Sequence, residues 1–193
     1  MVLSHHAVRG PLVTGLDFDG WLESAKAGEP GALSGLYREL NPLLRRFFTA
    51  RAPGSVDDLT QDTWLSVAEG IDRFEGDGAG FRSWLFTIAY RRLADHHRRS
   101  SRRKETAAEP EMLLALSPRV EQVDLAAMEE AMQHLVGGLS DDQADIVLLR
   151  IVGGLDVDQV AAIVGKSPGA VRVAQHRALQ RLAKGFVPST AAS

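Results

Sequence analysis

The sequence predicts an all-α fold: two small helical domains joined by a linker, the second containing a helix-turn-helix. Apolar residues recur every three or four positions along most of the chain, and helix-capping residues precede several of these segments. No segment shows the sustained two-residue alternation of a β-strand. A chain of 193 residues suits one medium domain or two small ones.

The composition narrows the class of protein. A hydrophobic fraction of 45% permits ordered cores, and the absence of cysteine excludes disulfides and cysteine-ligated metal and fits a reducing compartment. No apolar run approaches the roughly 20 residues that span a bilayer, and the N-terminal residues lack the pattern of a signal peptide. We therefore expect a cytoplasmic protein without membrane insertion.

The first domain is expected over residues 17–99, with four helices. Its core should include Trp64 and Trp84, which lie at helical spacing with leucines and isoleucine. The sequence predicts a flexible tail at 1–16, then a helix from Asp17 or Asp19 and a helix with Pro30 at its first position. A third helix is expected over 56–70, with apolar positions that include Leu65. A glycine-rich loop over 74–80 and a fourth helix over 81–99 follow.

Residues 100–120 are expected to form the interdomain linker, because they mix charge, serine, alanine and two prolines. The second domain follows over 121–185, and a tail over 186–193. Its first helix ends at paired glycines, and three capped helices follow. The capping residues are Ser140 with Gln143, Asp156 with Gln159, and Ser167 before Pro168; Ile151 is assigned to the apolar positions of the helix after Ser140.

Charge is sorted along the chain, although the net charge is only −3. Residues 55–77 contain seven acidic residues and one arginine, whereas 91–104 contain seven basic residues and one aspartate. Residues 166–184 contain five basic residues and no acid. Solvated helix faces explain any one of these clusters, but they explain the segregation less well. The pattern indicates one acidic and two basic surfaces.

The strongest local signal is the segment 155–182, in which two short helices are joined by a tight turn at Gly165. The second helix is capped and basic, which is typical of a helix-turn-helix that inserts its second helix into the major groove. Arg172 and Gln175 could bond to purine edges, and Arg177 and Arg181 could neutralise phosphates. A plain helical hairpin with a solvated basic face is the alternative.

Two further segments have a structural and a functional interpretation. The basic cluster of residues 91–104 lies at the C-terminal end of the fourth helix, where the helix macrodipole stabilises arginine. The cluster continues past the expected helix end, which the macrodipole does not require, and this favours a DNA-binding face. Asp57, Asp58, Gln61 and Asp62 occupy the first turns of the third helix. They could simply stabilise that helix N-terminus, or they could form a docking surface for a basic protein partner.

In their order and spacing these segments resemble extracytoplasmic-function (ECF) sigma factors, group IV of the sigma-70 family. The residues that match the family are DDLTQDTW at 57–64, FRSWLFTIAYRRLADHHRR at 81–99, LSDDQ at 139–143, GLDVDQVAAIVG at 154–165 and SPGAVRVAQHRALQRL at 167–182. The resemblance covers about residues 18–99 and 121–184. One departure is VAQHRA, where S-R-L-x-R-A is commoner, so Ala174 and Gln175 could alter the sequence that is recognised.

The resemblance implies a role for each matching residue. The first domain would bind core RNA polymerase at the clamp helices of its largest subunit, through Asp57, Asp58, Gln61 and Asp62. It would also recognise the −10 promoter element and help to melt it, through Phe74, Asp77, Arg82, Arg91, Arg92, Asp95, His96, Arg98 and Arg99. The chain would also contact the flap of the second-largest polymerase subunit. The second domain would recognise the −35 element through Lys166, Ser167, Arg172, Gln175, His176, Arg177 and Arg181.

The resemblance also implies promoter DNA and an anti-sigma factor as partners. It implies no cofactor, no metal and no enzymatic activity, and the acidic residues of 55–77 show no arrangement for acid–base catalysis. Two other functions remain open from the residues alone. The chain could be a one-component regulator that binds an operator through its helix-turn-helix, or a helical protein–protein adaptor.

Overall fold

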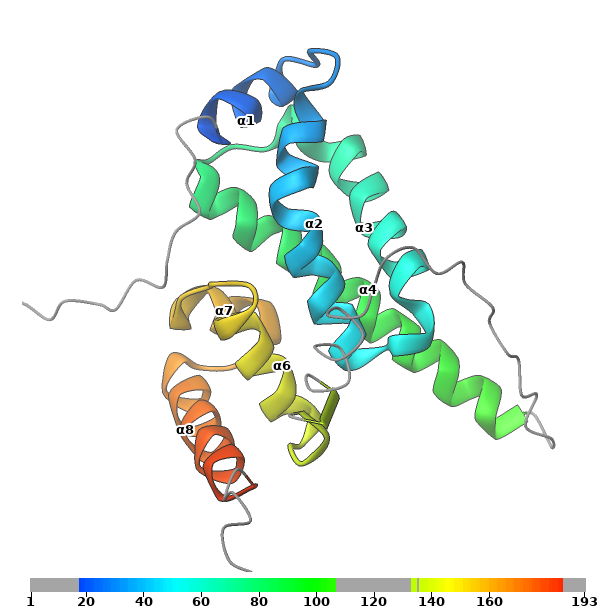
Figure 1. Ribbon diagram of the computed structural model, residues 1–193, viewed down its shortest axis with the longest axis vertical. Coiled ribbons are helices and arrows are strands. Elements are labelled where there is room, and N and C mark those ends of the chain that lie inside the picture. The colour runs from blue at the N-terminus through cyan, green and yellow to red at the C-terminus, as the bar shows by residue number, and fades with distance from the viewer. Residues whose placement is uncertain (1–17, 107–132, 135, 186–193) are drawn as a thin grey trace, which may run out of the picture.

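The computed structural model describes residues 18–106, 133, 134 and 136–185 (Figure 1). Within these ranges every regular element is helical, which confirms the predicted all-α fold, and none of the helices is both long and apolar enough to cross a membrane. The helices are α1 (Phe18–Lys26), α2 (Ala32–Arg51), α3 (Val56–Gly70), α4 (Gly78–Thr106), α6 (Asp141–Ile151), α7 (Val157–Val164) and α8 (Pro168–Gly185), with short 3₁₀ turns at Pro53–Ser55 and Ile71–Arg73.

Helix α2 is central to the N-terminal helices and contacts α1, α3 and α4 (Figure 1). Its apolar side chains recur at helical spacing and are buried: Leu36, Leu40, Leu44, Phe47 and Phe48. Gly35 lies under the indole of Trp21, where a Cβ would come within 2.3 Å of the ring. The absence of a side chain at Gly35 therefore lets α1 pack directly against α2.

Helix α4 is longer at both ends than the sequence predicts. It begins at Gly78, so the predicted loop over 74–80 is wrong for its last three residues. Asp77 stabilises this start, because its Oδ1 accepts a hydrogen bond from the backbone N–H of Gly80 at 2.8 Å. The helix then continues to Thr106, so residues 100–106, which we assigned to the linker, are helical. Residues 107–120 of the predicted linker lie outside the described residues.

The predicted caps of the C-terminal helices are present. Asp156 and Gln159 form a reciprocal capping box at α7, with bonds of 2.8 and 2.9 Å. The hydroxyl of Ser167 accepts from the backbone N–H of Ala170 at 3.2 Å, at the start of α8. Gly165 ends α7 with a φ of +67°, a left-handed conformation that glycine adopts without strain, so the tight turn of the helix-turn-helix is confirmed.

Three other assignments from the sequence are wrong. Pro30 is not the first residue of α2, which begins at Ala32 after Gly31 with a φ of +82°. Leu65 and Ile151, both assigned to apolar helix positions, are 53% and 62% exposed. Trp64, in contrast, is buried as predicted and donates its Nε1–H to Asn41 at 3.2 Å. Trp84, also predicted to be core, is only partly buried and packs against the edge of the core.

A charged contact joins α2 to α6, which are far apart in the sequence. The Nε of Arg51 lies 2.7 Å from Oδ1 of Asp145, and its Nη2 lies 2.9 Å from Oδ1 of Asp141. The side chains of Arg51 and Asp145 are only 11% and 12% exposed, so this pair is largely desolvated. Helix α7 also contacts α4. The C-terminal helices therefore pack against α2 and α4, with a buried ion pair at the junction.

Replacing Arg51 with alanine should lower the free energy of unfolding by about 3–5 kcal/mol, because the buried carboxylate of Asp145 would lose its partner. Arg45→Ala is the matched control: Arg45 also lies on α2 and pairs with Asp57, but both side chains are exposed, so its loss should cost less than about 1 kcal/mol. Chemical denaturation at neutral pH measures both. Equal costs for the two variants would contradict a buried ion pair at this junction.

The stability contributed by Asp145 should fall as the pH rises. Burial raises the pKa of Asp145 to about 6 from its ordinary 3.8, against the lowering effect of Arg51. Between these values the folded chain binds more protons at Asp145 than the unfolded chain does, so folding is favoured at the acidic end of the window. His97 acts in the opposite sense, because partial burial, Arg51 and His96 lower its pKa.

Comparison with Asp145→Asn separates the two groups, because this variant keeps His97. The stability of the wild type minus that of the variant should decrease from pH 4 to pH 7, as measured by denaturation at each pH. A difference that does not change over this range would contradict the raised pKa.

Candidate nucleic-acid interface

The exposed side of α3 is acidic. Asp58, Asp62, Leu65 and Glu69 are separated by three or four residues, lie on one face of the helix and are all exposed; we call them the α3 acidic face. Within the described part of the chain, Asp58 and Asp62 form no ion pair. Asp57 is different, because it bonds to Arg45 of α2. The carboxylates available to a partner are therefore Asp58, Asp62 and Glu69.

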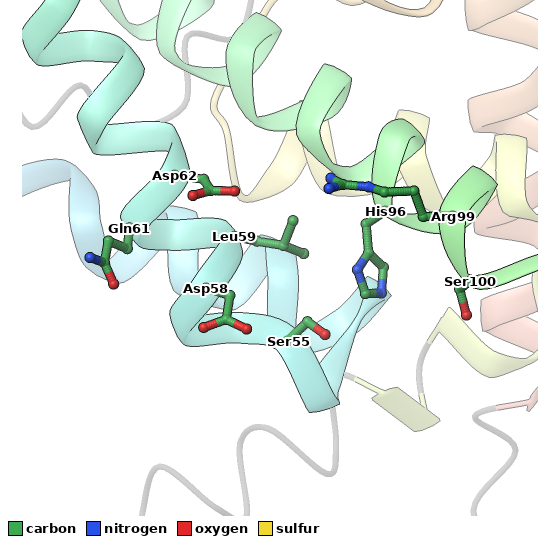
Figure 2. Close-up of a pocket in the computed structure, with 8 residues that line it drawn as sticks. All are labelled: Ser55, Asp58, Leu59, Gln61, Asp62, His96, Arg99 and Ser100. Atoms are coloured by element: carbon green, nitrogen blue, oxygen red, sulfur yellow. The ribbon is translucent and has the colours of Figure 1, made fainter. Parts of the chain in front are cut away.

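A groove of about 480 Å³ separates the start of α3 from the second half of α4 (Figure 2). The α3 wall includes Asp58, Gln61 and Asp62, and the α4 wall includes His96 and Arg99. Residues that the family resemblance assigned to the polymerase thus face residues that it assigned to −10 DNA. The structure brings part of two predicted sites to opposite sides of one groove.

The second half of α4 is basic, but its charges differ in availability. Arg91 is exposed, whereas Arg92 donates from Nη2 to the Ser66 hydroxyl of α3 at 2.6 Å. Asp95 forms an ion pair with Arg98, and its backbone carbonyl accepts from Nε of Arg99 at 3.3 Å. Asp95 thus orders two neighbouring arginines, which both stay exposed.

The other predicted −10 residues lie at the opposite end of α4. Phe74 stacks on Trp84 with a ring separation of 5.1 Å and is only half-buried, while Asp77 caps the helix. Arg82 is also half-buried, and burial lowers its pKa although Glu39 raises it. Arg82 and Arg98 are about 24 Å apart at 1.5 Å per helical residue. The predicted −10 set therefore forms two groups along α4.

The predicted −35 residues divide in a similar way. Arg172, His176 and Arg177 are exposed on α8. The other members bond to neighbouring parts of the chain: Gln175 accepts from Arg150 at 3.3 Å, Arg181 donates to Gln143 at 2.9 Å, Lys166 pairs with Asp142 at 2.7 Å, and Ser167 caps α8. The side chains free to meet a ligand are thus fewer than the sequence predicts.

Of the exposed apolar side chains, two lie among the charged residues of α3 and α8 and were not assigned to a site from the sequence. Leu65 lies within the α3 acidic face, and Val173 of α8 is 50% exposed beside Arg172 and Arg177. The signal that could have identified Val173 is its spacing of three residues from His176, which places both on the outward face of α8.

Comparison with known families shows two matches in chain order. The Sigma-70 region 2 family matches residues 36–103, which include α3 and most of α4. The Sigma-70 region 4 family matches residues 129–182, which include α6, α7 and most of α8. The acidic face, the groove and the basic half of α4 therefore lie in the first match, and the helix-turn-helix lies in the second.

Relatives that match over most of their length agree with these matches. The chain is 35% identical to the ECF RNA polymerase sigma factor SigD of Mycobacterium tuberculosis, over 85% of this chain and 81% of the relative. It is 32% identical to the ECF RNA polymerase sigma factor ShbA of Streptomyces griseus, over 82% of this chain and 89% of that protein.

Solved structures support the fold. The sigma factor RpoE of Bartonella quintana, solved with the anti-sigma factor NepR, aligns with a TM-score of 0.62 at 24% identity, over 80% of this chain and 96% of that one. CnrH, solved with the cytosolic domain of CnrY, aligns with a TM-score of 0.61 at 21% identity, over 88% of this chain and 97% of CnrH. Given both sigma-70 regions in order and relatives matched over most of their length, this chain belongs to the ECF RNA polymerase sigma factors, which direct transcription initiation.

Proposed function

We propose that this sigma factor binds core RNA polymerase through the α3 acidic face and contacts two promoter elements, the −10 element with α4 and the −35 element with α8. The observation that supports this most is the distribution of charge among the helices: exposed carboxylates lie on α3, and exposed arginines lie on α4 and α8. Family membership favours this function over a one-component regulator or an adaptor.

The α3 acidic face fits a basic protein surface. Asp58 and Asp62 are exposed and unpaired within the described residues, and Leu65 adds an apolar contact between Asp62 and Glu69. An apolar centre with a charged rim is the usual composition of a protein interface. In the proposal its partner is the clamp-helix region of the largest polymerase subunit, and the flap of the second-largest subunit binds the C-terminal helices.

The second half of α4 supplies the −10 contact in this proposal. Arg91, Arg98 and Arg99 are exposed and can neutralise phosphates, while His96 faces the groove. Phe74 and Trp84 form a partly buried aromatic pair beside the short loop before α4, where an unstacked base can pack. In this proposal the arginines bind the DNA backbone along the second half of α4, and the aromatic pair binds the opened strand near the start of the helix.

The −35 contact is assigned to α8. Its start is fixed by the Ser167 cap and the turn at Gly165, and Arg172, His176 and Arg177 are exposed within residues 168–177 of the helix. This is the geometry by which a recognition helix enters the major groove. The internal bonds of Gln175 and Arg181 hold α8 against α6, so in the proposal these two residues position the helix.

The proposal includes the functional division of the chain into 17–99 and 121–185, and a cytoplasmic protein that acts through binding alone. The family matches at 36–103 and 129–182 support that division. It also includes an anti-sigma factor as a partner, because two aligned structures with TM-scores above 0.6 are complexes, one with the anti-sigma factor NepR and one with the cytosolic domain of CnrY.

Replacing Asp58 and Asp62 together with lysine should weaken binding to core RNA polymerase at least ten-fold, because two attractive contacts become repulsive. Titration of labelled protein with core enzyme measures this affinity. Glu23→Lys with Glu29→Lys is the control: both residues are exposed near α1 and α2, and the net charge changes equally. Equal losses in the two double variants would show that net charge, rather than the α3 acidic face, determines binding.

Replacing Arg172 and Arg177 together with alanine should reduce run-off transcription from a promoter with an intact −35 element at least ten-fold. Arg172 would lose a contact to a base edge, which contributes about 1–3 kcal/mol, and Arg177 would lose a phosphate contact that does not depend on sequence. Core binding should be unchanged. Gln175→Ala should have a smaller effect, because that side chain already bonds to Arg150. A template with a scrambled −35 element is the control; an equal further loss on that template would contradict the assignment of α8.

A further inference from the structure

The outward face of α8 has an apolar centre. Val171 and Ala178 are fully buried and Ala174 packs against the core, which fixes the inner side of the helix. Successive helical residues turn by about 100°, so the opposite side is formed by Gly169, Val173, His176 and Gln180, all of them exposed. We call these four residues the α8 outer stripe.

Val173 is the apolar side chain of this stripe, and it lies between two cations. Arg172 and Arg177 flank the stripe and, among the described residues, form no ion pair or hydrogen bond with another side chain. His176 and Gln180 bond to each other, with their side-chain nitrogens 3.0 Å apart. Gly169 adds no side chain one turn before Val173, and the space where its Cβ would point is open beyond the Ser167 hydroxyl. A ligand can therefore approach the helix closely at Val173.

The chemistry of valine limits what it can recognise. It has neither donor nor acceptor, and a polar base edge opposite it would lose its hydrogen bond to water without replacement. In the major groove, the apolar feature of a base pair is the C5-methyl group of thymine. Because Val173 is β-branched, its side chain is also restricted to few rotamers and presents its methyl groups in a fixed direction.

We infer that Val173 is a specificity residue that contacts the methyl group of one thymine in the −35 element. The inference rests on the proposed function of α8 as the −35 recognition helix. It assigns the base preference at one position to an apolar contact, in an outer stripe whose other side chains, His176 and Gln180, are polar.

Replacement of thymine by uracil tests the contact, because it removes the methyl group and keeps every hydrogen-bonding group of the base. The −35 element is first located by base-pair substitutions, using run-off transcription with holoenzyme. Each of its thymines, on either strand, is then replaced by uracil. With the wild type, one replacement should lower transcription about three- to four-fold, which corresponds to the free energy of burying one methyl group.

With Val173→Ala, transcription from the thymine template should fall by a similar factor, and uracil at that position should cause no further loss. Leu179→Ala is the matched control, because Leu179 is a 43% exposed apolar residue of α8 outside the outer stripe. Transcription by the Leu179→Ala variant should show the same difference between the thymine and uracil templates as transcription by the wild type. Titration with core polymerase checks that both variants assemble.

Three results would overturn the inference: a −35 element without any thymine, no effect of uracil at any position with the wild type, or an undiminished effect of uracil with Val173→Ala. These results differ from a failure of the proposed function. In that case transcription by the wild type would not depend on any base pair of the −35 region, and Arg172→Ala with Arg177→Ala would have no effect.

Discussion

The burial of one side of α4 is the constraint on which the rest of the first sigma-70 region depends. Phe81, Leu85, Phe86, Ala89 and Leu93 are almost wholly buried against neighbouring helices. Once these side chains face the core, the helical period leaves Arg91 and Arg98 outside and turns His96 toward α3. The positions of the charges therefore follow from apolar packing, and the acidic and basic surfaces meet along the groove of Figure 2.

The contact between α2 and α6 is of another kind. Desolvation of Arg51 and Asp145 opposes their attraction, as the raised pKa of Asp145 shows. Pairs of this kind add little net stability compared with apolar packing, but loss of one partner is costly. The pair therefore specifies where α6 packs on α2 more than it strengthens the packing.

Local sequence signals predicted most of the architecture. The caps at Asp156 and Ser167 and the left-handed Gly165 act within a few residues, so their sequence pattern is sufficient to place α7 and α8. Side-chain partners across 25 to 94 residues leave no such pattern: the bonds of Gln175 to Arg150, Arg181 to Gln143 and Arg51 to Asp145 required the fold. Exposure of Leu65 was missed because apolar spacing alone does not tell which of two adjacent residues, Trp64 or Leu65, faces the core.

Transcription itself tests the central claim most directly. Core RNA polymerase, with and without this chain, would be supplied with genomic fragments, and the 5′ ends of the run-off products would be mapped. The account predicts discrete start sites that require the chain and share sequence at two upstream positions. The same products from core polymerase alone would contradict it.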